Sequence, residues 1–280
     1  DVELESFAVG VEESHGVLVT PETRDKDAAG GALVLAQLAT AEAKLGRTLV
    51  DTLNDLMTQH GVFANHLGNV VLEGATGGAR IEKIMASFRA TPPTQFGDRG
   101  IKNMTDRQDP NGPGGPIASA TDHVSRNQLS FALEGANRVT LRPSGTEPKL
   151  KVYIELSMPP FSEVTSTLKQ LKQEAAQLHQ AVLIEMLSRV GVTLPAWAFD
   201  IDDSVNLDTK IEWSTRVVPA LLEKLEMEPD TAADWLHNTL DIDARTLLKP
   251  GILSLIDTLG FDHETLRLCF DSPSETIAAD

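Results

Sequence analysis

The chain of 280 residues carries 41 acidic and 24 basic side chains, which give a formal net charge of -17 at pH 7. A protein this acidic repels nucleic acid, so we exclude DNA and RNA as partners. The sequence contains no continuous apolar run of about 18 residues, and we expect no membrane partner. The single cysteine, Cys269, excludes an intrachain disulfide and fits the reducing cytoplasm, where we expect the protein to act.

The N-terminal part of the chain predicts the end of a strand, a polar loop and two helices. Ser6–Val9 has the pattern of a strand end. A helix is expected from near Asp25, because apolar side chains then recur on one helical face. A second helix is expected over Thr48–His60, with Thr48 as its N-cap and Gly61 just beyond its end.

Residues 61–190 alternate between strand and helix patterns. Apolar and polar side chains alternate over 129–133, 138–141 and 150–156, which is the period of half-buried strands. An amphipathic helix is expected from Phe161 onward. This order favours an antiparallel sheet with helices on one face, which is an α+β arrangement.

Residues 191–280 have a helical pattern without an internal repeat. Four prolines are expected to divide this region into short helices: Pro195, Pro219, Pro229 and Pro250. An acidic cluster of Asp200, Asp202, Asp203 and Asp208 lacks the glycine and the final glutamate of a calcium loop. We therefore interpret the cluster as a solvated linker and expect Asp202→Ala to leave the binding of glucose 1-phosphate unchanged.

One segment between two predicted strands combines the groups that bind phosphate. It is Arg142-Pro143-Ser144-Gly145-Thr146-Glu147-Pro148-Lys149. A phosphate dianion needs several convergent donors, and a guanidinium, two hydroxyls, an accessible glycine backbone and an ammonium group provide them. The phosphate-binding candidates are Arg142, Ser144, Gly145, Thr146 and Lys149. Glu147 either orients Arg142 or faces solvent, and a plain surface hairpin is the alternative interpretation.

A second segment, Gly10-Val11-Glu12-Glu13-Ser14-His15-Gly16, carries groups that accept hydrogen bonds from sugar hydroxyls. The sugar-binding candidates are Glu12, Ser14 and His15. A solvated acidic loop is the alternative interpretation.

Both segments resemble loops of the α-D-phosphohexomutase family, which includes phosphoglucomutases and phosphomannomutases. The first is similar to the family's phosphate-binding loop, and the second has the Glu-x-Ser core of its sugar-contacting loop. The resemblance covers residues 7–157, and loosely the helix up to Val190. It implies that Glu12 and Ser14 contact the sugar. Some members place the histidine one residue later than His15, and Lys26 is interpreted as the partner of a neighbouring carboxylate.

The resemblance also implies a domain order. Residues 1–60 would be the end of an α/β sugar-binding third domain, and residues 61–190 would be an α+β fourth domain that binds phosphate. Residues 191–280 have no counterpart in the family, and we expect a helical extension of unknown role, either a cap or an interaction module that could join copies of the chain into an oligomer.

The implied activity is phosphotransfer between the 1- and 6-positions of a hexose phosphate through a bisphosphate intermediate. The family uses a phosphoserine in a motif like Thr-Ala-Ser-His-Asn-Pro and Mg²⁺ in a loop like Asp-Gly-Asp-x-Asp-Arg, and neither string occurs here. We therefore expect no catalytic or metal-binding residue in this chain, and no activity of the chain alone. The implied partners are hexose monophosphates, hexose 1,6-bisphosphate as activator, and the N-terminal half of the same enzyme, which would bind the Mg²⁺.

Three hypotheses remain open. The chain begins at Asp1 rather than at methionine, which we interpret as truncation or cleavage of a full mutase. The alternatives are one chain of a split mutase and a non-catalytic module that binds sugar phosphates. The preference for glucose, mannose or pentose phosphate is left undecided.

Overall fold

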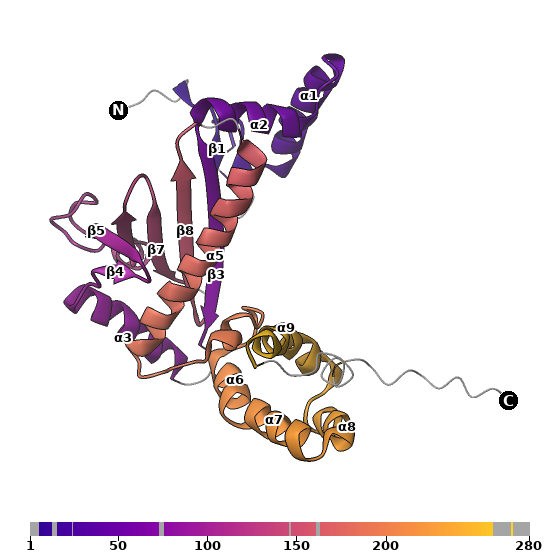
Figure 1. The fold of residues 1–280 in the computed structure, drawn as a ribbon. Coiled ribbons are helices and arrows are strands. Elements are labelled where there is room, and N and C mark those ends of the chain that lie inside the picture. The colour runs from indigo at the N-terminus through magenta and orange to yellow at the C-terminus, as the bar shows by residue number, and fades with distance from the viewer. Residues whose placement is uncertain are drawn as a thin grey trace. The chain divides into compact units, whose positions relative to one another are not determined.

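The computed structural model describes residues 6–12, 16–23, 25–72, 76–145, 147–160, 163–259 and 270. The chain divides into two compact units, one of residues 1–63 with 158–169 and one of residues 64–157 with 170–280. Figure 1 shows helices together with a twisted sheet, and the printed strand pairs are antiparallel, so the expected α+β class is confirmed. The finer division into domains stays a prediction.

The first unit starts with a short hairpin. Strand β1 (Gly10–Val11) pairs antiparallel with β2 (Val17–Leu18), and the chain turns where Glu12 N donates to Gly16 O at 2.9 Å. The expected strand end at Ser6–Val9 is therefore wrong. The pairing falls on the residues that flank the turn, because the hydrogen bond that closes the turn brings them into register.

Two helices follow the hairpin. Helix α1 (Ala28–Lys44) begins after Asp27, whose carboxylate accepts a hydrogen bond from Ala29 N at 3.0 Å. Helix α2 (Leu49–His60) has Thr48 as its N-cap and ends at Gly61, which has a φ of 114°. The expected second helix and both of its end signals are confirmed. Neither helix has a buried side chain.

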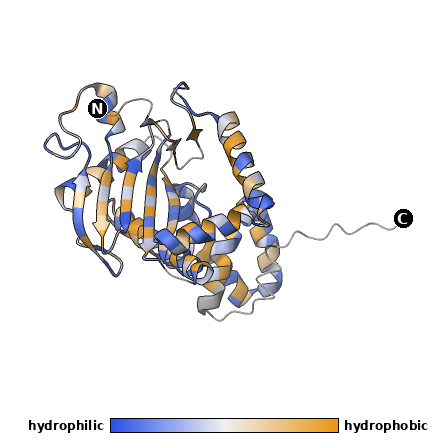
Figure 2. Ribbon diagram, turned by 90° about the horizontal axis from the view of Figure 1, so that it is seen from above, coloured by the Kyte–Doolittle hydropathy of each residue, from blue (hydrophilic) through white to orange (hydrophobic). Residues whose placement is uncertain are grey.

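The sheet has six strands in the order β3-β8-β7-β6-β5-β4. The strands are β3 (Val62–Val71), β4 (Gln95–Phe96), β5 (Arg99–Asp106), β6 (Leu129–Leu133), β7 (Arg138–Pro143) and β8 (Lys149–Met158). Neighbouring pairs from β4 through β8 are antiparallel. Side chains alternate along β8 between buried apolar and more exposed polar types. Figure 2 shows alternating orange and blue bands on strands of the sheet.

Two helices cover the apolar face of this sheet, α3 (Gly77–Ala90) and α5 (Val164–Ser188) (Figure 1). Phe88 of α3 meets Phe131 of β6 and Phe96 of β4, with ring centroids 5.8 Å and 6.4 Å from that of Phe88. All three rings are buried, and this cluster anchors the core. A short helix, α4 (Ala120–Ser125), precedes β6. The other face of β7 and β8, which we call the open face, carries the exposed or partly exposed side chains of Arg142, Lys151 and Tyr153.

The C-terminal region is helical over its described residues, as expected. It consists of η2 (Ala196–Phe199), α6 (Leu207–Glu212), the π-helical turn η3 (Trp213–Val217), α7 (Val218–Met227), α8 (Pro229–Thr239) and α9 (Ile242–Leu259). Its own core includes Trp197, Trp213, Leu221, Leu236 and Leu248. We call residues 191–259 the helical extension. Among the described helices, none is both long enough and apolar enough to cross a membrane.

Two prolines of the extension do not separate helices. Pro219 lies at the second residue of α7, directly after the π-helical turn, so the helical path continues through it. Proline has no backbone N–H to donate, and the wider π-helical turn before it accommodates the missing hydrogen bond without ending the helix. Pro250 lies inside α9, and the next residue, Gly251, packs where an added Cβ would lie 2.8 Å from Trp197 O. The expected breaks at these two prolines are therefore wrong.

Candidate functional site

The predicted phosphate loop joins β7 to β8 at the tip of a hairpin. In the register, Arg142 lies opposite Lys151 and Pro143 lies opposite Leu150. The hairpin closes where Ser144 N donates to Lys149 O at 2.9 Å. Directly opposed residues of an antiparallel pair point to the same face. Arg142 and Lys151 therefore place two positive charges side by side on the open face of the sheet.

The neighbours of this cation pair are polar. Arg142 is exposed, and Lys151 Nζ lies 5.9 Å from the ring centroid of Tyr153, which follows on the same face. Gly145 is exposed at the tip, and a Cβ added there would meet no atom within 4 Å. The backbone of the loop is thus open to an anion from outside. Thr146 lies outside the described residues.

The acidic residue of the loop pairs with its lysine. Glu147 Oε2 lies 2.6 Å from Lys149 Nζ. The hydrogen bond from Lys149, and then the charges of Lys149 and Lys151, hold the pKa of Glu147 below its ordinary value. Of the two roles considered for Glu147, exposure to solvent agrees with the structure, since 58% of the side chain is exposed while it pairs with Lys149. A phosphate would share Lys149 with this carboxylate.

The predicted sugar loop lies in the first unit, between β1 and β2. Glu12 Oε1 lies 3.5 Å from Lys26 Nζ, and Lys26 also lies 4.0 Å from Asp25 Oδ1. The expected pairing of Lys26 with a carboxylate is therefore confirmed. A Cβ added to Gly16 would lie 2.4 Å from Glu12 Oε1 and 2.5 Å from Lys26 Cδ, so the glycine permits this close packing. Ser14 and His15 lie outside the described residues.

Glu12 and Lys26 are among the residues that line a cavity of about 300 Å³. Both side chains are exposed in it, with side-chain accessibilities of 43% and 60%. An exposed carboxylate beside an ammonium group offers an acceptor and a donor to a polyhydroxylated ligand.

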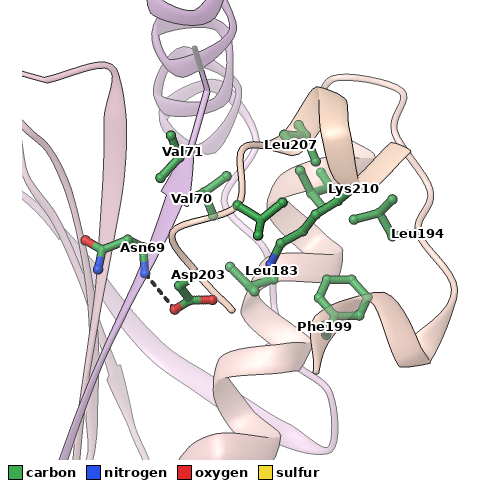
Figure 3. Close-up of a pocket in the computed structure, with 11 residues that line it drawn as sticks. Asn69, Val70, Val71, Leu183, Leu194, Phe199, Asp203, Leu207 and Lys210 are labelled. Carbon is green, nitrogen blue, oxygen red and sulfur yellow. Dashed lines mark hydrogen bonds between the residues drawn. The ribbon is translucent and has the colours of Figure 1, made fainter. Parts of the chain in front are cut away.

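The acidic cluster of the extension is a solvated linker only in part: Asp200 and Asp202 are exposed as expected, whereas Asp203 and Asp208 make contacts with the sheet and α3. Asp203 Oδ2 accepts a hydrogen bond from Asn69 N of β3 at 3.1 Å, which Figure 3 shows as a dashed line. Asp208 pairs with Arg80 of α3 at 2.6 Å. β3 is the edge strand of the sheet, so Asp203 satisfies an outward N–H that would otherwise stay open. The cluster attaches the extension to the sheet.

Buried polar groups lie behind this attachment. Lys210 of α6 is buried and donates from Nζ to Ile201 O at 2.9 Å, and burial lowers its pKa. His179 of α5 packs against His66 with ring centroids 4.7 Å apart, and burial lowers the pKa of His179 to about 4. Sequence patterns missed this arrangement, because neither lysine nor histidine signals burial.

The described residues contain no group of three or more histidine, cysteine or acidic side chains that could hold a metal ion.

The second unit combines a sheet covered by helices on one face with a hairpin loop that carries Arg142 and Lys149 near Lys151. Residues 69–159 match the family described as phosphoglucomutase/phosphomannomutase, C-terminal domain. Phosphoglucomutases from Staphylococcus epidermidis and Staphylococcus aureus are 33% and 31% identical over 173 and 170 residues, or 59% and 57% of this chain. This part of the chain is thus similar to the C-terminal domain of the phosphohexomutase family.

The match is partial on both sides. The aligned region spans 30% and 29% of the two staphylococcal relatives. A solved structure described as pp63/parafusin (phosphoglucomutase) from Paramecium, open form, has a TM-score of 0.38 and 15% identity over 66% of this chain and 31% of that chain. At that level of similarity the solved structure supports no conclusion.

Proposed function

We propose that this chain anchors the phosphate of a hexose phosphate for a phosphosugar mutase, an isomerase that moves a phosphoryl group between the 1- and 6-positions. The observation that carries the proposal is the pairing of Arg142 with Lys151 on the open face beside an accessible loop backbone. The guanidinium bonds two phosphate oxygens, and Ser144, Gly145 and Thr146 add donors. Lys149 adds charge while it shares Glu147.

The anchoring role has a physical rationale in the family's reaction. A bisphosphate must present either of its ends to the same reacting group, so the other end has to be held at a fixed place. Holding a reactant in position lowers the activation barrier by on the order of 7–11 kcal/mol. Glu12, Ser14 and His15 would contact the hydroxyls that both orientations share, with Glu12 presented beside Lys26.

The phosphoserine and the Mg²⁺ of the reaction would come from sequence outside this chain. We therefore propose that the chain alone is inactive and that the N-terminal half of the enzyme is its partner, with hexose 1,6-bisphosphate as intermediate. A separate chain could supply that half, which is the split-enzyme alternative. The helical extension by itself favours no further function. A non-catalytic module that binds sugar phosphates is the last alternative.

The test is a titration of the 280-residue chain with inorganic phosphate and with glucose 1-phosphate, followed by NMR or calorimetry. Arg142→Ala should weaken both by roughly tenfold to a hundredfold, because a hydrogen bond to a charged group contributes about 1.5–3 kcal/mol. Arg142→Lys should recover only part of the loss, because lysine lacks the planar fork.

Arg138→Ala is the matched control. Arg138 is exposed at the other end of the same strand, where it pairs with Glu155 at 3.5 Å. The Arg138→Ala variant removes the same charge without changing the loop. Its affinities for inorganic phosphate and for glucose 1-phosphate should therefore stay close to those of the wild type. Equal affinities of wild type and Arg142→Ala would refute the proposed anchor.

A further inference from the structure

A cavity of about 660 Å³ lies between the phosphate loop and the helical extension. Its size falls in the range of small-molecule sites. The residues that line it come from the loop, from β3 and from one turn of the extension: Asn69, Val71, Glu147, Pro148, Lys149, Asp202, Asp203 and Ser204. All of them belong to the second unit. The extension thus forms one wall of the space that the phosphate loop opens into.

That wall is a fixed turn rather than a mobile tail. Asp203 is occupied by its bond to Asn69 N, which holds the turn against β3. Asp202 Oδ1 accepts a hydrogen bond from Ser204 N at 2.8 Å, and Val205 N donates to Asp202 O at 3.1 Å. Asp202 and Ser204 themselves remain exposed. Bonds from the Ser204 hydroxyl and from its backbone N–H hold the pKa of Asp202 below its ordinary value, so this carboxylate is charged at neutral pH.

The opposite wall is formed by β3, which contributes Asn69 and Val71. Asn69 Oδ1 is itself buried, so this oxygen does not face a ligand in the cavity. Val71 and Pro148 supply apolar surface between these polar groups.

We propose that Asp202 and Ser204 bind the hydroxyl groups of the sugar whose phosphate lies on the Arg142 loop, so that the helical extension helps to select the sugar. This inference rests on the proposed function. A carboxylate and a serine hydroxyl both accept hydrogen bonds from sugar hydroxyls. The apolar residues between them suit the C–H groups of a sugar ring.

The charges of the cavity place the sugar, and not the phosphate, against this wall. Three of the lining side chains are acidic and one is basic, and Lys149 is paired with Glu147. A phosphate dianion there would be repelled, whereas Arg142 and Lys151 attract it on the neighbouring open face. Lys149, which belongs both to the loop and to the cavity lining, joins the two parts of the site.

The experiment compares two ligands on the 280-residue chain, glucose 1-phosphate and inorganic phosphate. Asp202→Ala should weaken glucose 1-phosphate by about tenfold, the loss of a hydrogen bond to a charged group. The same variant should bind inorganic phosphate as well as wild type or a few times more tightly, because a negative charge near the anion has been removed. Ser204→Ala should show a smaller loss for the sugar phosphate and no change for phosphate.

Asp200→Asn is the matched control. Asp200 is exposed in the same segment, and its substitution removes one charge outside the cavity lining. It should leave both affinities unchanged. Equal glucose 1-phosphate affinity of Asp202→Ala and wild type, or tighter binding of both ligands by the variant, overturns the inference. Either result leaves the Arg142 anchor standing, because that anchor is judged by the loss of inorganic phosphate in Arg142→Ala.

Discussion

The helices α1 and α2 and the six-stranded sheet use their apolar side chains in opposite ways. The sheet buries Phe131, Leu141 and Val152 completely, each with 0% exposure. In the two helices no side chain is buried, and Leu33 and Val50 keep 60% and 63% of their surface exposed. The helices have strong local start and stop signals, whereas the sheet has a core. Local signals therefore specify a helix here without specifying what it packs against.

Two matched side-chain truncations, one in the sheet and one in α1, test this difference in burial most directly. Phe131→Ala should lower the free energy of unfolding by about 3–5 kcal/mol, because it empties a fully buried site among three aromatic rings. Leu35→Ala should change it by less than about 0.5 kcal/mol, because Leu35 is 55% exposed. Urea denaturation of both variants measures the difference.

A large loss in Leu35→Ala would contradict the comparison, since it would mean that α1 packs against something in solution. A second copy of the chain is one such partner, and the loss would then depend on protein concentration. A similar loss at all concentrations would place the partner within the chain itself.

The next largest effect concerns the buried histidine behind the extension. Burial lowers the pKa of His179 from 6.5 to about 4, while the charges of Asp203, His66 and Lys210 also act on it. The unfolded chain then binds a proton between these two pH values and the folded chain does not. Stability is full above pH 6.5 and falls as the pH drops toward 4, by on the order of 3 kcal/mol.

Urea denaturation at pH 7 and at pH 4.5 tests this pH dependence. His179→Gln should remove most of the loss attributable to this side chain, although the variant is expected to be less stable at pH 7. His60→Asn is the control, because His60 is exposed at the end of α2 and should leave the pH dependence as in wild type. An unchanged slope in His179→Gln would show that other groups cause the acid sensitivity.

Sequence patterns predicted the elements whose signals are local. The alternation along residues 129–133 and 150–156 and the N-cap at Thr48 all correspond to observed elements. Strands β4 and β5 were not predicted, because β5 is interrupted by a register shift between Ile101 and Asn103 that breaks the two-residue period.

The candidate site shows the same limit. The phosphate loop is a continuous segment, so its cationic and hydroxyl groups are recognisable in the sequence. The cavity beside it joins Asn69 to Asp202, which are far apart in the chain, and no local pattern records that contact. The acidic turn was interpreted as solvated because its bond to Asn69 N exists only in the folded chain.

The smallest effect sharpens the comparison from the side of the helices. Thr48 and Asp51 form a capping box, in which Thr48 N donates to Asp51 at 2.7 Å and Asp51 N donates to the Thr48 hydroxyl at 3.3 Å. Thr48→Ala should weaken α2 locally by about 1 kcal/mol. Because α2 buries no side chain, this loss should not reach the sheet. Hydrogen exchange of the first α2 amides should accelerate by roughly fivefold, while the urea midpoint of the sheet stays unchanged.

Thr58→Ala, the same replacement at an exposed position inside α2, should leave exchange at the helix start as it was. A shift of the global midpoint in Thr48→Ala would show that the helix and the sheet unfold together, and the contrast between a locally specified and a core-specified region would fail.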